Sequence, residues 1–343
     1  FSIDVREDWK QIFVDAWRLE RDYFYDPGMH GVDWVAVRDT YLPLVDRVTT
    51  REELSDLIGR VVGELSALHT SVRGGDLREG PDKISVPTLG ARLDRDSQAG
   101  GYRIEHIYRS DPDFPDRLSP LADLDLGIKE GDIIETVNGV DTMSLAHIGS
   151  ALRNQAGKQV RLRVKSADTS ESKDVIVVPT GNERSLRYRD WEYTRRLKVE
   201  EAGEGKLGYV HLQAMGGNDI TAWYEQFYPV FNRQGLILDF RHNRGGNIDS
   251  LILEKLMRRA WFYWKSRAGE PTWNMQFAFR GHIVALCNQD TSSDGEAVIA
   301  GLRRLGLGKI IGMRTWGGEI WLSSTNRLSD GGLARAPMSG VYG

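Results

Sequence analysis

The stretch from residue 282 to residue 305 constrains the fold most, because an apolar strand and a helix follow each other there across a tight turn. Residues 282–287 are almost continuously apolar and predict a buried strand. Apolar residues at helical spacing follow from 294 to 305, and Gly306 predicts the end of that helix. A strand that feeds a helix in this way is typical of a layered α/β domain.

The turn between this strand and helix carries Ser293, at a place where a nucleophile could act. A helix N-terminus presents unpaired N–H groups and a partial positive charge, which would stabilise an oxyanion beside Ser293. The alternative is that Ser293 or Asp294 only caps the helix, since both residue types are favoured there. The local pattern by itself favours the cap.

A second strand-to-helix turn contains the glycine pair Gly245-Gly246. It follows a predicted strand at residues 235–240 and precedes a predicted helix at 248–259. Two such turns at the ends of neighbouring strands could supply the N–H groups of an oxyanion hole around Ser293. The alternative is an ordinary turn, which a glycine pair usually marks.

The chain divides into three parts by its periodicity. Residues 5–24 and a segment opening with the capping box at 50–53 predict amphipathic helices. Short β segments at 90–93, 102–104, 133–137, 160–164 and 174–178 follow, with one helix at roughly 144–154. Strands and helices then alternate from about residue 183 onward. The predicted domains are therefore 1–80, 81–182 and 183–343.

Composition excludes several classes of function. The chain has 343 residues, a net charge of -4 and a pI near 6.0, so we expect no nucleic-acid partner. It has no apolar run long enough to cross a membrane, and its start shows no signal-peptide pattern, so we expect no membrane partner and a cytoplasmic location. A periplasmic location is the alternative, if a signal peptide was removed. Both ends suggest a longer protein. Cys287 is expected to be a buried, inert thiol.

No metal site or cofactor is expected. The seven histidines are scattered, without the paired histidine or carboxylate spacing of a zinc or calcium site.

Residues 126–139, with the sequence LGIKEGDIIETVNG, resemble the signature of a PDZ domain. PDZ domains bind an extended peptide as an added strand. The resemblance implies that Leu89, Gly90 and Ala91 form the loop that holds the peptide's terminal carboxylate. The alternative is a PDZ fold that serves only as a spacer.

Three segments together resemble the catalytic core of the tail-specific and tricorn serine peptidases. They are residues 239–246 (DFRHNRGG), residues 293–295 (SDG) and residues 315–318 (TWGG), and the PDZ segment stands in the same order as in that family. The resemblance also covers residues 65–76. It implies a crotonase-like (ClpP-like) layered α/β peptidase domain with an N-terminal helical unit and an inserted PDZ β-sandwich or barrel.

The resemblance separates two catalytic branches. Tail-specific peptidases use a lysine base, and Gly318 stands at that position here. Tricorn-type enzymes use a histidine base, which corresponds to His69. Leu68 stands where tricorn has a serine, and the glutamate that orients the base is expected beyond Gly343.

The sequence thus predicts a tricorn-type serine peptidase that acts on unfolded polypeptides or oligopeptides. Ser293 is the predicted nucleophile and His69 the base, and the N–H groups of Asp294 and of Gly245 or Gly246 form the oxyanion hole. The resemblance implies a homo-oligomer, a hexamer as in tricorn. The alternative is a non-catalytic protein of the same fold that binds peptides or hydrophobic ligands.

Overall fold

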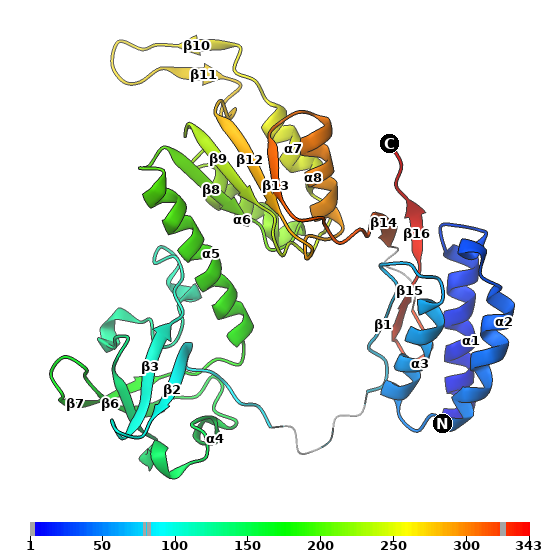
Figure 1. The fold of residues 1–343 in the computed structure, drawn as a ribbon, viewed down its shortest axis with the longest axis horizontal. Coiled ribbons are helices and arrows are strands. Elements are labelled where there is room, and N and C mark those ends of the chain that lie inside the picture. The colour runs from blue at the N-terminus through cyan, green and yellow to red at the C-terminus, as the bar shows by residue number, and fades with distance from the viewer. Residues whose placement is uncertain (1–3, 78–79, 81–83, 323–326) are drawn as a thin grey trace. The chain divides into compact units, whose positions relative to one another are not determined.

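The computed structural model describes residues 4–77, 80, 84–322 and 327–343. The chain folds into two compact units, one made of residues 1–79 and 205–343 and the other of residues 80–204 (Figure 1). The first unit therefore combines the two ends of the chain.

A small helical bundle opens the first unit. It contains α1 (Val5–Tyr23), α2 (Trp34–Tyr41) and α3 (Arg51–Gly63), with 3-10 turns at Met29–Gly31 and Leu42–Arg47. The predicted capping box is present at the start of α3, because Thr50 Oγ1 accepts the Glu53 N–H and the Glu53 carboxylate accepts the Thr50 N–H. The apolar faces of α1 and α3 pack together with Trp34 in one core.

A four-stranded parallel sheet forms the centre of the first unit. Its order is β13-β12-β9-β8. The strands are β8 (Leu207–His211), β9 (Gly235–Asp239), β12 (His282–Cys287) and β13 (Lys309–Gly312). All neighbours are parallel, so their carboxyl ends lie at one edge of the sheet. This is the edge where the turns carrying Ser293 and the glycine pair begin.

Three helices pack with this sheet. They are α6 (Gly217–Phe227), α7 (Asp249–Met257) and α8 (Asp294–Arg304). Their buried residues join the strands in one core, and Trp223 stacks on Phe227 within it. The near-continuous apolar strands that predicted a layered α/β arrangement are thus covered by helices.

Three antiparallel strand pairs also lie in the described part of the first unit. They are β1 (Ser71–Arg73) with β15 (Leu333–Arg335), β14 (Ile320–Leu322) with β16 (Pro337–Gly340), and β10 (Phe262–Trp264) with β11 (Thr272–Asn274). The β1–β15 pair joins the end of the helical bundle to a strand from the end of the chain. A buried ion pair between Arg51 and Asp330, at 2.5 Å, reinforces this connection.

The second unit is an antiparallel β domain with a long helix. Its sheet has the order β2-β3-β4-β6-β7, and β5 pairs with β4. The strands are β2 (Ala91–Asp96), β3 (Gly101–Ile107), β4 (Ile133–Val137), β5 (Val140–Asp141), β6 (Val160–Lys165) and β7 (Ser172–Val177). Helix α5 (Glu183–Ala202) follows, and 3-10 turns lie at Pro115–Arg117, Leu124–Leu126 and Thr142–Ser144.

The helix predicted at 144–154 is shorter in the structure, where α4 spans Gly149–Leu152. The Arg95 guanidinium donates hydrogen bonds to the carbonyl oxygens of Met143 and Leu145, at 2.7 and 2.5 Å. The His147 ring then accepts the Gly149 N–H. Side chains therefore hold the backbone groups that a helix through 144–148 would have needed, so that part of the prediction is wrong.

Candidate active site

Ser293 lies in a strained turn immediately before α8. Its backbone has φ 56° and ψ -125°, a conformation that residues other than glycine rarely adopt. A capping residue would instead have extended backbone angles, and no hydrogen bond joins the Ser293 side chain to the first turn of the helix. The hydroxyl is therefore not used as a cap.

The glycine turn packs directly against this serine. A methyl group on Gly245 would lie 2.9 Å from the Asp294 nitrogen, so no larger residue fits there. Gly245 also has φ 73°, which glycine adopts without strain. The next residue, Gly246, bridges to Met215 beside β8. The two predicted strand-to-helix turns do meet.

The N–H groups of these turns differ in availability. Gly245 donates its N–H to Asn243 Oδ1 at 2.9 Å. By contrast, no acceptor within the described part of the chain takes the N–H of Gly246 or Asp294. Those two N–H groups are free to bind an external oxygen.

The side chain of Asp294 has a structural position. Its Oδ2 accepts the N–H groups of Ile248 and Asp249, at 2.7 and 3.1 Å, and so caps α7 from the neighbouring helix. Burial raises the pKa of Asp294 to about 7, and the nearby charge of Asp249 acts in the same direction.

His69 lies between α3 and β1, half-buried, with a positive φ of 67°. Its ring meets the Trp316 ring edge-on at 4.9 Å between centroids. A methyl group on Gly318 would come within 3.2 Å of His69 Cε1. The histidine from the helical bundle therefore lies against the segment where the tail-specific branch has its lysine.

The electrostatics of His69 favour the neutral ring. Burial lowers the pKa of His69, while the charge of Glu296 and a backbone hydrogen bond with Gly318 partly oppose that shift. Its Nδ1 is buried and has no hydrogen-bond partner among the residues described. A neutral ring can accept a proton, as a general base must.

Glu296 is a site residue that the sequence prediction missed. Its carboxylate lies between Ser293 and Gly318 and accepts a backbone N–H from each, both at 2.9 Å. The pattern Ser-x-x-Glu at 293–296 was a usable signal, because it is the sequence of a capping box. In the structure only the glutamate half of that motif forms.

The predicted peptide loop of the second unit precedes β2. Leu89 is buried, and its carbonyl accepts the Leu121 N–H. Gly90 has φ 79° and donates its N–H to Thr88 Oγ1, while Ala91 begins the edge strand β2. One free strand edge thus begins at this loop.

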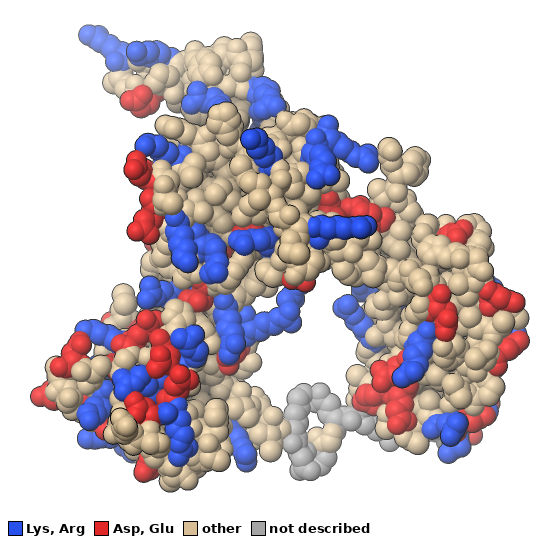
Figure 2. All heavy atoms as spheres, viewed as in Figure 1, with Lys and Arg blue, Asp and Glu red and all other residues tan. Residues whose placement is uncertain are grey.

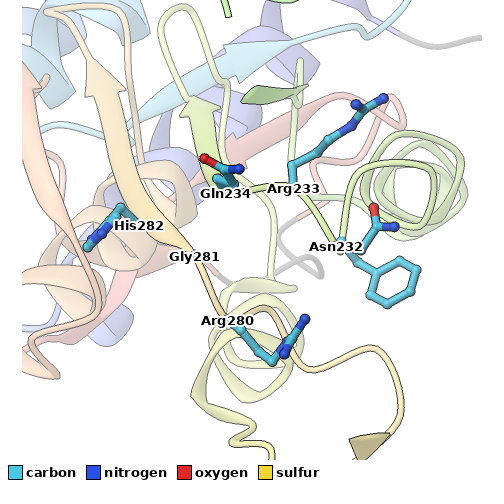
Figure 3. A pocket seen from close by; sticks show the side chains of 7 residues that line it. Asn232, Arg233, Gln234, Arg280, Gly281 and His282 are labelled. Atoms are coloured by element: carbon cyan, nitrogen blue, oxygen red, sulfur yellow. The ribbon is translucent and has the colours of Figure 1, made fainter. Parts of the chain in front are cut away.

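A hollow of about 360 Å³ lies at the other edge of the parallel sheet from Ser293 (Figure 3). It is bordered by His282 at the start of β12, and its labelled side chains diverge. Arg280 instead stacks over Trp273 at 3.7 Å. The side chains do not converge on one point, so this hollow is not the candidate site.

Among the residues that the structure describes, no group of three or more His, Cys, Asp or Glu side chains is placed to hold a metal ion. Within the same ranges, no helix has the length and apolar character needed to span a membrane. Side chains of both charge signs lie on both units on the face shown in Figure 2.

Comparison with known proteins agrees with this geometry. Family models match the tricorn protease C1 domain at residues 5–63, the tricorn protease PDZ domain at 88–182 and peptidase family S41 at 206–343. The chain carries a tricorn-type core, made of C1, PDZ and family S41 peptidase domains. The tricorn-type resemblance predicted from sequence is confirmed, as is a mixed α/β peptidase fold with a PDZ domain.

The similarity to individual tricorn-type proteins extends along nearly the whole chain. Tricorn protease homolog 1 of Streptomyces coelicolor is 37% identical over 341 residues, which are 98% of this chain and 31% of that protein. Tricorn protease of Thermoplasma acidophilum is 30% identical over 335 residues, 97% of this chain and 31% of that protein. A crystal structure of the tricorn protease matches with a TM-score of 0.91 at 29% identity, covering 99% of this chain and 33% of that one. This tricorn-type chain thus spans about a third of the length of these relatives.

Proposed function

We propose that the chain hydrolyses peptide bonds, with Ser293 as nucleophile and His69 as general base. The observation that carries the proposal is the backbone of Ser293. Its positive φ takes the hydroxyl out of the capping position, in a turn that packs against the glycine turn. Within the described part of the chain, the N–H groups of Asp294 and Gly246 in these two turns have no acceptor. A strained turn of this kind between strand and helix is how other hydrolases expose a nucleophilic serine.

The reaction would proceed through an acyl-enzyme. His69 takes the proton of the Ser293 hydroxyl as Oγ bonds to the substrate carbonyl carbon, and the carbonyl oxygen becomes an oxyanion. The carbon–nitrogen bond then breaks, and the leaving amine takes the proton from His69. Water repeats the sequence with the same base, which releases the acid and restores Ser293.

We assign the oxyanion hole to the N–H groups of Asp294 and Gly246. Both lie at turns on the carboxyl edge of the parallel sheet and lack other acceptors. Gly245 has a different role, because its own N–H is held by Asn243. It permits the close approach of the two turns.

The base is proposed to be histidine and not lysine. Gly318 stands at the lysine position and has no side chain, and the His69 ring lies close to it. We also propose that a glutamate beyond Gly343 accepts a hydrogen bond from the Nδ1–H of His69, since that buried nitrogen has no partner in the described ranges.

The wider setting rests on the family. We propose that the substrates are unfolded polypeptides or oligopeptides, that the protein is a hexameric homo-oligomer and that it is cytoplasmic. We also propose that the catalytic part has crotonase-like layering, and that the domains are 1–80, 81–182 and 183–343. The parallel sheet with its packed helices supports the layering.

We propose that the loop at Leu89, Gly90 and Ala91 binds peptide carboxyl ends. The free edge of β2 supports strand addition there. The test is binding of a fluorescent peptide to the Ser293→Ala protein, with the same peptide carrying an amidated C-terminus as control. Equal binding of both peptides would contradict carboxylate recognition.

A fluorophosphonate probe tests the nucleophile. The wild-type protein should be labelled and should cleave an unfolded protein substrate, whereas Ser293→Ala should do neither. Ser292→Ala is the matched control, because the neighbouring Ser292 hydroxyl donates to the Asn243 carbonyl and should not be needed. Absence of labelling in the wild type would favour the non-catalytic binding protein instead.

A further inference from the structure

Glu296 has an unusual set of partners for a buried carboxylate. Only 4% of the residue is exposed. Its Oε2 accepts the N–H groups of Ser293 and Gly318, both at 2.9 Å, and its Oε1 accepts the Gly317 N–H at 2.5 Å. Its three hydrogen-bond donors in the described ranges are thus all backbone N–H groups. Backbone N–H groups therefore satisfy the charge.

These hydrogen bonds join two separate parts of the chain. Ser293 ends the turn after β12, whereas Gly317 and Gly318 belong to the segment between β13 and β14. Hydrogen bonds to an ionised acceptor are about twice as strong as neutral ones. One buried side chain thus fixes the nucleophile turn to the Gly317–Gly318 segment.

The same segment forms one wall around His69. The Trp316 ring lies edge-on to the imidazole, and the Trp316 N–H is held by the Thr291 carbonyl. Gly318 approaches His69 Cε1 so closely that an added methyl group would be tightly packed. A shift of this segment would therefore move the surroundings of the base relative to the nucleophile.

Glu296 also acts on His69 through its charge. The negative charge of Glu296 raises the pKa of His69, whereas burial lowers it, so Glu296 favours the protonated imidazole. The imidazole becomes protonated when it takes the Ser293 proton. A fixed carboxylate near it stabilises that charge during the transfer.

We propose that Glu296 is a positioning residue that sets the geometry between Ser293 and His69 and stabilises the imidazolium formed in the reaction. This inference rests on the proposed roles of those two residues. Glu296 is assigned no part in the proton transfer itself, because its carboxylate oxygens accept backbone N–H groups.

Glu296→Gln is the first test. In this variant an amide replaces the carboxylate, so the negative charge is lost. One carboxylate oxygen also becomes an NH₂ group, which donates hydrogen bonds and must face a backbone N–H that also donates. We expect kcat, normalised to the fraction of protein labelled by fluorophosphonate, to fall about 10- to 100-fold, as for loss of a hydrogen bond to a charged group. KM should change much less. The acid limb of kcat/KM should move to lower pH, because the protonated His69 loses its counter-charge.

Glu254→Gln is the matched control, since Glu254 is an exposed glutamate on α7 that pairs with Arg258. It should leave kcat and the pH profile unchanged. Glu296→Asp provides a second variant if the amide fails to fold. The aspartate keeps the negative charge, but its shorter side chain cannot make all three backbone hydrogen bonds, so kcat should fall.

The outcomes separate this inference from the proposed function. Unchanged normalised kcat and an unmoved acid limb in Glu296→Gln would overturn the positioning role, as would full activity in Glu296→Asp. If Ser293→Ala stays active, the proposed nucleophile has failed. A purely structural glutamate would lower the melting temperature and the labelled fraction, but the remaining active protein would keep its pH profile.

Discussion

A methyl group on Gly245 would lie only 2.4 Å from the Ser293 Cβ. Carbon atoms in folded proteins do not approach so closely, so the glycine is needed for the two turns to meet. The neighbouring backbone offers no relief, because the same methyl group would also lie 2.8 Å from the Ser292 carbonyl oxygen. The position of the proposed nucleophile thus depends on a residue with no side chain.

Gly245→Ala should therefore displace the Ser293 turn. We expect kcat/KM to fall roughly a hundredfold or more, because small misplacements of reacting groups have effects of that size. The measurement is hydrolysis of a fluorogenic peptide together with the rate of fluorophosphonate labelling.

Gly306→Ala controls for backbone strain. Gly306 also has a positive φ, 64°, but an added methyl group would meet no atom within 4 Å. This variant should lose some stability and keep its labelling rate. Equal loss of labelling in both variants would mean that strain, and not the contact with Ser293, is responsible.

His69→Gln should remove the near-neutral dependence of activity on pH. In the proposed mechanism the neutral ring is the active form, so activity should be lost as the pH falls through the pKa of His69. Burial lowers that pKa, so the limb in kcat/KM should lie below the ordinary imidazole value of about 6.5. The variant should retain about a thousandth of the wild-type kcat or less, without the limb.

His242→Gln is the matched control for a second histidine near the sheet edge. Its Nδ1 lies 2.9 Å from Asp290 Oδ2, in the turn before Ser293. The acid limb should survive this change. If it disappears here and persists in His69→Gln, His242 is the base.

Sequence patterns predicted the two central strands of the parallel sheet, β9 and β12, because most of their residues are buried or half-buried and apolar. The strand at residues 282–287 has the predicted bounds. The 20-residue helix α5 was not predicted, since Leu186 is its one buried residue and charges surround the rest. A helix without an apolar stripe gives no periodicity to detect.

The site was only partly accessible from sequence. The turn residues Ser293 and Gly245 were predictable because strand, turn and helix are local. His69 is separated from Ser293 by more than two hundred residues of sequence, and only family resemblance indicated it. The three backbone hydrogen bonds of Glu296 depend on how distant segments pack, which no local pattern encodes.

The Arg51–Asp330 pair should be important for joining the ends of the chain. Both side chains are buried, with 4% and 7% exposed, so removing one partner leaves a buried charge. Asp330→Ala should lower the free energy of unfolding by roughly 3–5 kcal/mol. Replacing both residues, as in Arg51→Met with Asp330→Leu, should recover much of this loss. A double variant as unstable as the single one would show that the pair's hydrogen bonds matter more than the unpaired charge.

Glu20 should make the stability of the helical bundle depend on pH. It is fully buried in α1, and neither carboxyl oxygen has a hydrogen-bond partner in the described part of the chain. Burial raises the pKa of Glu20 from 4.5 to about 8. Between these values the folded protein binds a proton that the unfolded chain has released, so stability falls as the pH rises towards 8. The loss from pH 5 to pH 8 should be on the order of 2–4 kcal/mol.

Glu20→Gln removes the titrating carboxyl, so the variant should not lose stability with pH as the wild type does. Its melting temperature should therefore rise relative to that of the wild type as the pH is raised from 5 to 8. Glu7→Gln, on the exposed side of the same helix, is the control and should show no such trend. The measurement is the difference in melting temperature between variant and wild type at each pH. A constant difference for Glu20→Gln would mean that the carboxyl ionises normally inside the fold. Water would then have to reach the Glu20 carboxyl, either by penetrating the packed core or through a local opening of α1.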